Sequence, residues 1–130
     1  MTRTVDDATL DLITSLLFRK WTLPILQSLG TTTKRYSTLS RMLPKITQKV
    51  LTERLKQLER GGIVQHVLHS TNPPQVEYRL TEMGIKLLGV ANDIECYFHD
   101  HSEEICRSQK MYDRRREDAR VLVFRRLLVL

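Results

Sequence analysis

The stretch that decides the fold is residues 47–62, TQKVLTERLKQLERGG. Three of its residues recur at spacings of four and three, which places them on one face of a helix: Leu51, Leu55 and Leu58. The opposite face is polar and charged, with Lys49, Glu53, Lys56 and Arg60. Thr47 is a natural N-cap, and Gly61 or Gly62 can adopt the left-handed conformation that ends a helix. Alone, the stretch is also typical of an ordinary surface helix, so its neighbours must decide its role.

A shorter helix is predicted immediately before it. Ser37 can cap residues 37–43, whose Leu39, Met42 and Leu43 form one apolar face. Pro44 stops this helix, because proline disfavours helical geometry at the residue before it. A helix, a short turn and a longer capped helix with an amide and a lysine at its start form the layout of a helix-turn-helix. In that unit the second helix enters the DNA major groove.

Two strands are predicted after it, at residues 63–69 and 75–80. In the second, Val76, Tyr78 and Leu80 alternate with polar side chains, as expected of a half-buried strand. The pair would form a wing, so the predicted fold is mostly α with a small β-wing. The tip of the wing is uncharged and contains Ser70, Thr71 and Asn72. It could hydrogen-bond phosphate or reach the minor groove, although it lacks the arginine that a strong minor-groove reader would use.

Length and charge narrow the class of protein. The chain has 130 residues, 41% hydrophobic and 28% charged, which favours one globular domain over a disordered chain. Its N-terminus lacks the pattern of a signal peptide, and no apolar run approaches the ~20 residues that span a bilayer, so we expect a cytoplasmic protein without a membrane partner. Of the net charge of +6, residues 19–60 carry ten basic residues and two glutamates, a net +8. A basic block that coincides with a helix-turn-helix indicates a phosphate-binding face.

Helices are also expected on either side of this region. Residues 7–19 carry a stripe of Leu10, Ile13 and Leu17, and a second helix should begin near Thr22, with Trp21 in the core. From Glu82, capped by Thr81, apolar positions recur at alternating spacings of four and three and form a heptad seam. The seam, broken by polar residues at two positions, comprises Leu87, Ala91, Ile94, Phe98, His101, Ile105, Ser108 and Tyr112. A seam of this length usually packs against another helix.

Residues 113–130 mix arginine clusters with apolar runs. This pattern is compatible with a helix that closes over a partner chain, with a surface-binding amphipathic segment, and with a poorly ordered tail. Val121, Phe124 and Leu128 share a helical stripe that could join a dimer interface.

No pattern in the sequence indicates catalysis, a metal or a cofactor. Phosphate loops, zinc-protease motifs and Ser/His/Asp arrangements are absent, so we expect no enzyme. Cys96, His99, Glu103 and Cys106 share one helical face, but on a straight helix the two cysteines are roughly 15 Å apart and cannot share one tetrahedral ion.

Four motifs together resemble the HxlR-type winged helix-turn-helix regulators of prokaryotes: KWTLPIL at 20–26, RYSTL at 35–39, ITQKVLTERLKQLERGGIV at 46–64 and PPQVEYRLTEMG at 73–84. The resemblance implies a homodimeric, DNA-binding transcriptional regulator whose first and last helices pair. An unknown small-molecule effector is a possible further partner. The dimer interface would then comprise Leu10, Ile13, Leu17, Leu87, Ala91, Ile94, Phe98 and Ile105. We assign residues 1–112 to this domain and residues 113–130 to an extension, because the family domain usually ends near residue 110. Redox-sensing members carry a cysteine about thirteen residues before the tryptophan, where this chain has Ala8.

The DNA contacts follow from this layout. We expect Thr47, Gln48, Lys49 and Thr52 to approach the major groove. Phosphate contacts are expected from Arg35, Arg41 and Lys56, with Arg54 as a further candidate. The function predicted is sequence-specific regulation from an inverted-repeat operator, and the alternative is a winged-helix module that binds protein or RNA.

Overall fold

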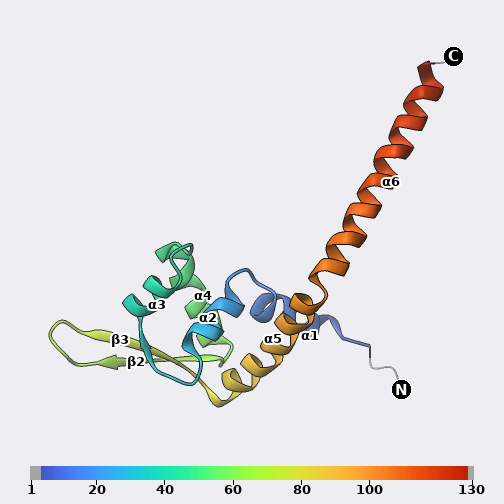
Figure 1. The fold of residues 1–130 in the computed structure, drawn as a ribbon. Coiled ribbons are helices and arrows are strands. Elements are labelled where there is room, and N and C mark those ends of the chain that lie inside the picture. Colours follow the sequence, from blue (N-terminus) through green and yellow to red (C-terminus); the bar gives the residue numbers. More distant parts are fainter. Residues whose placement is uncertain (1–3, 129–130) are drawn as a thin grey trace. The chain divides into compact units, whose positions relative to one another are not determined.

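The computed structural model describes residues 4–128 (Figure 1). In chain order the elements are α1 (Asp7–Leu12), the π-helix η1 (Ile13–Leu17), α2 (Thr22–Leu29), β1 (Lys34–Arg35), α3 (Tyr36–Met42), α4 (Gln48–Arg60), β2 (Val64–His69), β3 (Gln75–Leu80), α5 (Glu82–Asp100) and α6 (Ser102–Leu128). The chain forms two compact units, which divide between Asn92 and Asp93. This is a mostly helical fold with a small sheet, as predicted.

The core of the first unit lies where α2, α3 and α4 meet the base of the sheet. Its fully buried side chains come from all of these elements: Ile25, Leu26, Leu29, Leu39, Leu51, Leu55, Leu58 and Val64. Each buried aliphatic side chain stabilises the fold by about 1.5–3 kcal/mol relative to exposure. The leucine face of α4 therefore packs into the core, and its polar face is left toward solvent.

The sheet has three antiparallel strands in the order β1-β3-β2. β2 pairs with β3 from Val64 opposite Leu80 to His69 opposite Gln75, and Lys34 of β1 lies opposite Tyr78. β3 has the predicted bounds, whereas β2 begins one residue later than predicted. Ile63 instead takes part in the C-terminal cap of α4, since its amide donates to the Leu58 carbonyl at 2.9 Å.

Both ends of α4 are capped as its sequence predicts. The Thr47 hydroxyl oxygen accepts a hydrogen bond from the Val50 amide at 3.2 Å. At the other end the amides of Gly62 and Ile63 donate to the carbonyls of Glu59 and Leu58, a Schellman motif. Gly62 is the residue in the left-handed conformation, with φ of 76°.

The start of α5 is fixed against this motif. The Thr81 hydroxyl donates to the Gly62 carbonyl at 2.5 Å and accepts from the Gly84 amide at 3.1 Å, which confirms Thr81 as the cap. Gly84 is buried, and a Cβ built on it would lie 2.1 Å from the Ile63 carbonyl oxygen. Only glycine permits this close approach of helix and chain.

Three local predictions were wrong. α3 begins at Tyr36, before Ser37, with Arg35 at the N-cap position and no side-chain cap. Met42 of its expected apolar face is 47% exposed. Thr22 is the first residue of α2 rather than its cap, because Trp21 occupies the cap position in the left-handed conformation.

The structure also differs in detail from the two long helices that were predicted. Residues 7–19 form α1 followed by the π-turn η1, where the Thr14 hydroxyl donates to the carbonyls of Leu10 and Asp11. Such hydroxyl-to-backbone bonds compete with regular helix geometry. The pattern from Glu82 is two helices, parted at His101, whose ring Nδ1 lies 2.8 Å from the Tyr97 carbonyl oxygen.

The second unit contains the last turns of α5 and all of α6. α6 is one continuous helix of 27 residues, so residues 113–128 are helical. This agrees both with a helix that closes over a partner chain and with a surface-binding amphipathic segment. None of its residues is buried, and its exposed apolar residues are Met111, Tyr112, Val121, Leu122, Val123, Phe124, Leu127 and Leu128. Within residues 4–128, no helix is both long and apolar enough to cross a membrane.

Candidate nucleic-acid interface

The N-terminal end of α4 presents exposed polar side chains. Thr47, Gln48 and Lys49 are all exposed there, next to the turn that follows α3. The Thr47 oxygen is occupied by the Val50 amide, but its own proton remains available for a ligand. These three residues thus provide an amide, a cation and a hydroxyl at one helix end.

Tyr36 holds this end of α4 from the side, a role that the sequence did not indicate. Its hydroxyl donates to the Gln48 carbonyl at 3.1 Å and lies 3.1 Å from the Thr52 hydroxyl. Because a tyrosine has one hydroxyl proton, Thr52 must then donate to Tyr36. Thr52 is half-buried, and toward a ligand it offers only its methyl group and an acceptor oxygen.

The basic side chains around α4 differ in their exposure and in whether another side chain binds them. Arg41 and Lys56 are exposed and form no ion pair with any residue of the described chain. Arg35 is also exposed but lies 3.9 Å from the Glu77 carboxylate. Arg54 is the exception, because it is half-buried and its Nη1 donates to the Gln57 side chain at 2.5 Å. Arg54 is therefore directed along its own helix, and its Nε is buried without a partner.

The wing is tied to α4 and to itself by histidine–carboxylate contacts. His66 of β2 contacts Glu59 of α4, and His69 Nε2 lies 2.9 Å from a Glu77 oxygen. The ring of Tyr78 lies between those of Tyr36 and His66, with centroid distances of 6.5 and 6.4 Å. Burial raises the pKa of Tyr78, and the negative charge of Glu59 adds to this shift.

The wing tip is exposed at all three predicted contact positions, Ser70, Thr71 and Asn72. The Thr71 hydroxyl donates to the Pro73 carbonyl at 2.8 Å, which leaves its oxygen as an acceptor.

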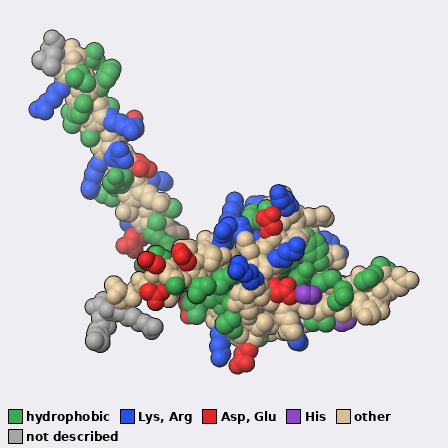
Figure 2. Space-filling model, turned by 180° about the vertical axis from the view of Figure 1, so that it is seen from behind, with side chains coloured by type: hydrophobic (Ala, Val, Ile, Leu, Met, Phe, Trp, Pro, Cys, Tyr) green, Lys and Arg blue, Asp and Glu red, His purple; other side chains and the backbone are tan. Residues whose placement is uncertain are grey.

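Figure 2 shows several Lys and Arg side chains at the top of the globular unit, the end where α3 and α4 lie in Figure 1. The exposed helix end thus belongs to a basic surface.

A capped helix with a polar N-terminus, a preceding short helix and a two-stranded wing define a winged helix-turn-helix. The family model that matches is the HxlR-like helix-turn-helix, over residues 16–105. The chain belongs to the HxlR-like helix-turn-helix family. As a member of this family it is a transcriptional regulator with a helix-turn-helix domain.

Relatives in Bacillus subtilis (strain 168) support this assignment. The HTH-type transcriptional regulator YtcD is 36% identical over 99 residues, which cover 76% of this chain and 75% of YtcD. The HTH-type regulator YodB is 33% identical over 99 residues, covering 74% of this chain and 88% of YodB. The crystal structure of diamide-treated YodB aligns with a TM-score of 0.66 and 31% identity, over 75% of this chain and 96% of that one.

A second solved structure gives the same fold. A transcriptional regulator of the MarR family from Enterococcus faecalis V583 aligns with a TM-score of 0.67 and 34% identity. The alignment covers 82% of this chain and 97% of the other. These relatives and structures are transcriptional regulators, and the chain shares their fold.

The residues predicted for a dimer interface differ in their exposure to solvent. Leu10 and Phe98 are 51% and 57% exposed, and Ile13, Ile94 and Ile105 are half-buried. Ala91 is different, because it is 2% exposed and belongs to the core of the first unit. Leu17 and Leu87 also pack against that core. Ala91 has no surface to offer a partner, so we omit it from the interface.

The possible ligand side chains of the second unit are not assembled into a site. Among residues 4–128, no group of three or more His, Cys, Asp or Glu side chains could hold a metal ion. Cys96 and Cys106 are both free and exposed, and they lie in different helices.

Proposed function

We propose that this regulator binds an inverted-repeat DNA operator as a homodimer, with α4 as the recognition helix. The observation that carries the proposal is the exposed, capped N-terminus of α4 with its amide and lysine, set in a basic surface. A helix of this kind reads base edges with its first turns. Sequence-independent affinity would come from phosphate contacts by the surrounding cations.

Within the recognition helix each side chain has a separate role. Gln48 pairs with an adenine edge, a contact worth about 1–3 kcal/mol of discrimination. Lys49 and Thr47 supply further donors, and Thr52 presents its methyl group. Arg41 and Lys56 bind phosphates. Arg35 also binds a phosphate, after it gives up its ion pair with Glu77. The wing tip adds hydroxyl and amide contacts. Arg54 has the weakest case for a DNA contact, because its guanidinium is engaged with Gln57.

The homodimer supplies the second half-site. Exposed and half-buried apolar residues of the N-terminal segment and of the α5–α6 seam would pair across a twofold axis: Leu10, Ile13, Ile94, Phe98 and Ile105. Two recognition helices would then lie about 34 Å apart, one DNA turn, or a multiple of it.

Salt-dependent binding tests the proposal directly. Genomic footprinting would first identify bound sites, and fluorescence anisotropy would then compare a bound duplex with a scrambled one from 50 to 200 mM salt. We expect tighter binding to the footprinted duplex and a steep fall in affinity with salt. Equal binding of the two duplexes would contradict operator recognition. Preferential capture of RNA of the same sequence would favour the alternative class of winged-helix module.

A further inference from the structure

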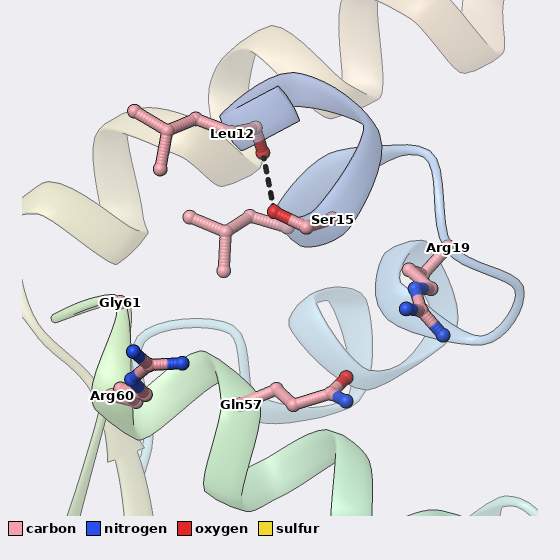
Figure 3. A pocket seen from close by; sticks show the side chains of 7 residues that line it. Leu12, Ser15, Arg19, Gln57, Arg60 and Gly61 are labelled. Atoms are coloured by element: carbon pink, nitrogen blue, oxygen red, sulfur yellow. Dashed lines mark hydrogen bonds between the residues drawn. The ribbon is translucent and has the colours of Figure 1, made fainter. Parts of the chain in front are cut away.

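A pocket of about 450 Å³ lies between the N-terminal segment and the C-terminal end of α4 (Figure 3). Its volume is within the range of about 300–1,000 Å³ typical of small-molecule sites. The lining residues are Leu12, Ser15, Leu16 and Arg19 from the N-terminal segment, and Gln57, Arg60 and Gly61 from α4 and its cap. All of them belong to the first compact unit.

The apolar side of the pocket depends on a glycine. A Cβ built on Gly61 would lie 2.8 Å from Leu16 Cδ2 and 3.1 Å from Cδ1, so the Leu16 side chain would have to shift from its present position. Gly61 thus lets the Leu16 side chain reach the end of α4. Together with Leu12, Leu16 offers an apolar surface at one side of the opening.

The polar side of the pocket consists mainly of hydrogen-bond donors. Arg19 and Arg60 approach from different elements, with Gln57 between them in Figure 3. No carboxylate lines the pocket, and the guanidinium group of neither arginine has a hydrogen bond or ion pair within residues 4–128. The Gln57 side-chain oxygen Oε1 accepts from Arg54 Nη1, so its side-chain NH₂ remains free to donate into the pocket.

We propose that this pocket binds a small organic anion with an apolar body, such as an aromatic carboxylate, and is the effector site of the regulator. A carboxylate can pair with a guanidinium group beside the Gln57 amide, and charge-assisted hydrogen bonds of this kind are among the stronger ones. Leu12 and Leu16 match the apolar body. A neutral ligand would leave the arginines unpaired, and an inorganic anion would leave the leucines exposed.

The regulatory part rests on the proposed function of α4 as the recognition helix. Gln57 and Arg60 belong to the same helix as Gln48 and Lys49, and a helix of 13 residues transmits a displacement of one end to the other. An anion held between Arg19 of the N-terminal segment and Gln57 of α4 fixes the end of α4 relative to that segment. It changes operator affinity by as much as its affinity differs between the DNA-free and DNA-bound proteins.

Isothermal titration of the full chain with 2-naphthoate tests the site without DNA. Its neutral counterpart, 2-naphthamide, has the same shape and should bind at least tenfold more weakly. Arg19→Gln/Arg60→Gln should weaken naphthoate binding at least tenfold, whereas Arg107→Gln/Lys110→Gln, which removes equal charge from α6, should not. Circular dichroism would verify that both variants are folded. Equal binding of the two ligands to the wild type, or equal naphthoate binding by the two double variants, would overturn the site.

The effector role is tested by repeating the anisotropy measurement with 2-naphthoate. We expect a shift of at least threefold in the operator Kd of the wild type and none for Arg19→Gln/Arg60→Gln. Binding of naphthoate with no shift in the wild type would overturn the effector role. A protein that binds naphthoate but no DNA under any condition would instead contradict the proposed function, while the titration still decides the pocket.

Discussion

At the scale of single residues, Tyr36 shows how a side chain can organise a helix to which it does not belong. Its hydroxyl bonds to the Gln48 carbonyl and to Thr52 across the turn of the helix-turn-helix. Tyr36→Phe removes both bonds and keeps the ring, so it should lower the free energy of unfolding by about 1 kcal/mol. Urea denaturation measures this, with Tyr112→Phe on exposed α6 as the control. Equal midpoints for both variants would contradict the role of the hydroxyl.

Residue 8 bears on redox sensing. This chain has alanine where redox-sensing members of the family carry a cysteine, and its two cysteines lie in the second unit, away in sequence from α4. Mild oxidation with diamide should therefore leave operator affinity unchanged. Anisotropy titrations of the wild type and of Cys96→Ser/Cys106→Ser would measure this. A loss of binding confined to the wild type would show that the exposed cysteines act as a sensor.

At the scale of elements, the prediction is sharpest for α5. A Cβ at Gly84 would meet the Ile63 backbone at 2.1 Å, and neither helix nor chain can yield cheaply there. Gly84→Ala should destabilise the protein by about 3 kcal/mol, the upper part of the overpacking range. Gly89→Ala in the same helix meets nothing within 4 Å and should stabilise it by up to about 1 kcal/mol through helix propensity. Thermal denaturation of both variants tests this expectation. Similar melting temperatures would contradict the close approach of Gly84 to the Ile63 backbone.

The elements that could be predicted from sequence are those with local signals. Thr47 and the glycine pair fix the ends of α4, and alternation fixes β3. The π-turn at Ile13–Leu17, the start of α3 and the division at His101 depend on side-chain bonds to the backbone and on packing. The same holds for the candidate site: its exposed polar residues were visible in the helical pattern, whereas the contacts of Tyr36 and Arg54 were not. A heptad pattern does not distinguish a core position from a position that faces a partner, and Ala91 of that pattern lies in the core of the first unit.

At the scale of the whole molecule, the proposed homodimer accounts for the exposed apolar side chains. Phe98 is the largest of the proposed interface residues and is 57% exposed. Its truncation would cost about 3–5 kcal/mol if a partner buried it fully. Phe98→Asp should therefore give folded monomers with weak operator binding. Ile85→Asp, on another side of α5, is the matched control and should remain dimeric.

Analytical ultracentrifugation measures both variants and also a chain that ends at Tyr112. We expect the shortened chain to dimerise more weakly, since it lacks the exposed stripe of Val121, Phe124 and Leu128. A monomeric wild type would contradict the homodimer. An unchanged dimer after shortening would remove only the contribution of α6 beyond Tyr112.

In the proposed complex the N-terminus of α4 reads bases while the surrounding cations bind phosphate. The most direct test is the ratio of operator to scrambled-duplex affinity, measured by anisotropy across salt for wild type, Gln48→Ala and Lys56→Ala, with Lys86→Ala as a control. Gln48→Ala should lower this ratio about 5- to 150-fold, the equivalent of about 1–3 kcal/mol. Lys56→Ala should weaken both duplexes alike and reduce the salt slope by about one. An unchanged ratio in Gln48→Ala, or an equal loss for both duplexes in both variants, would contradict the claim.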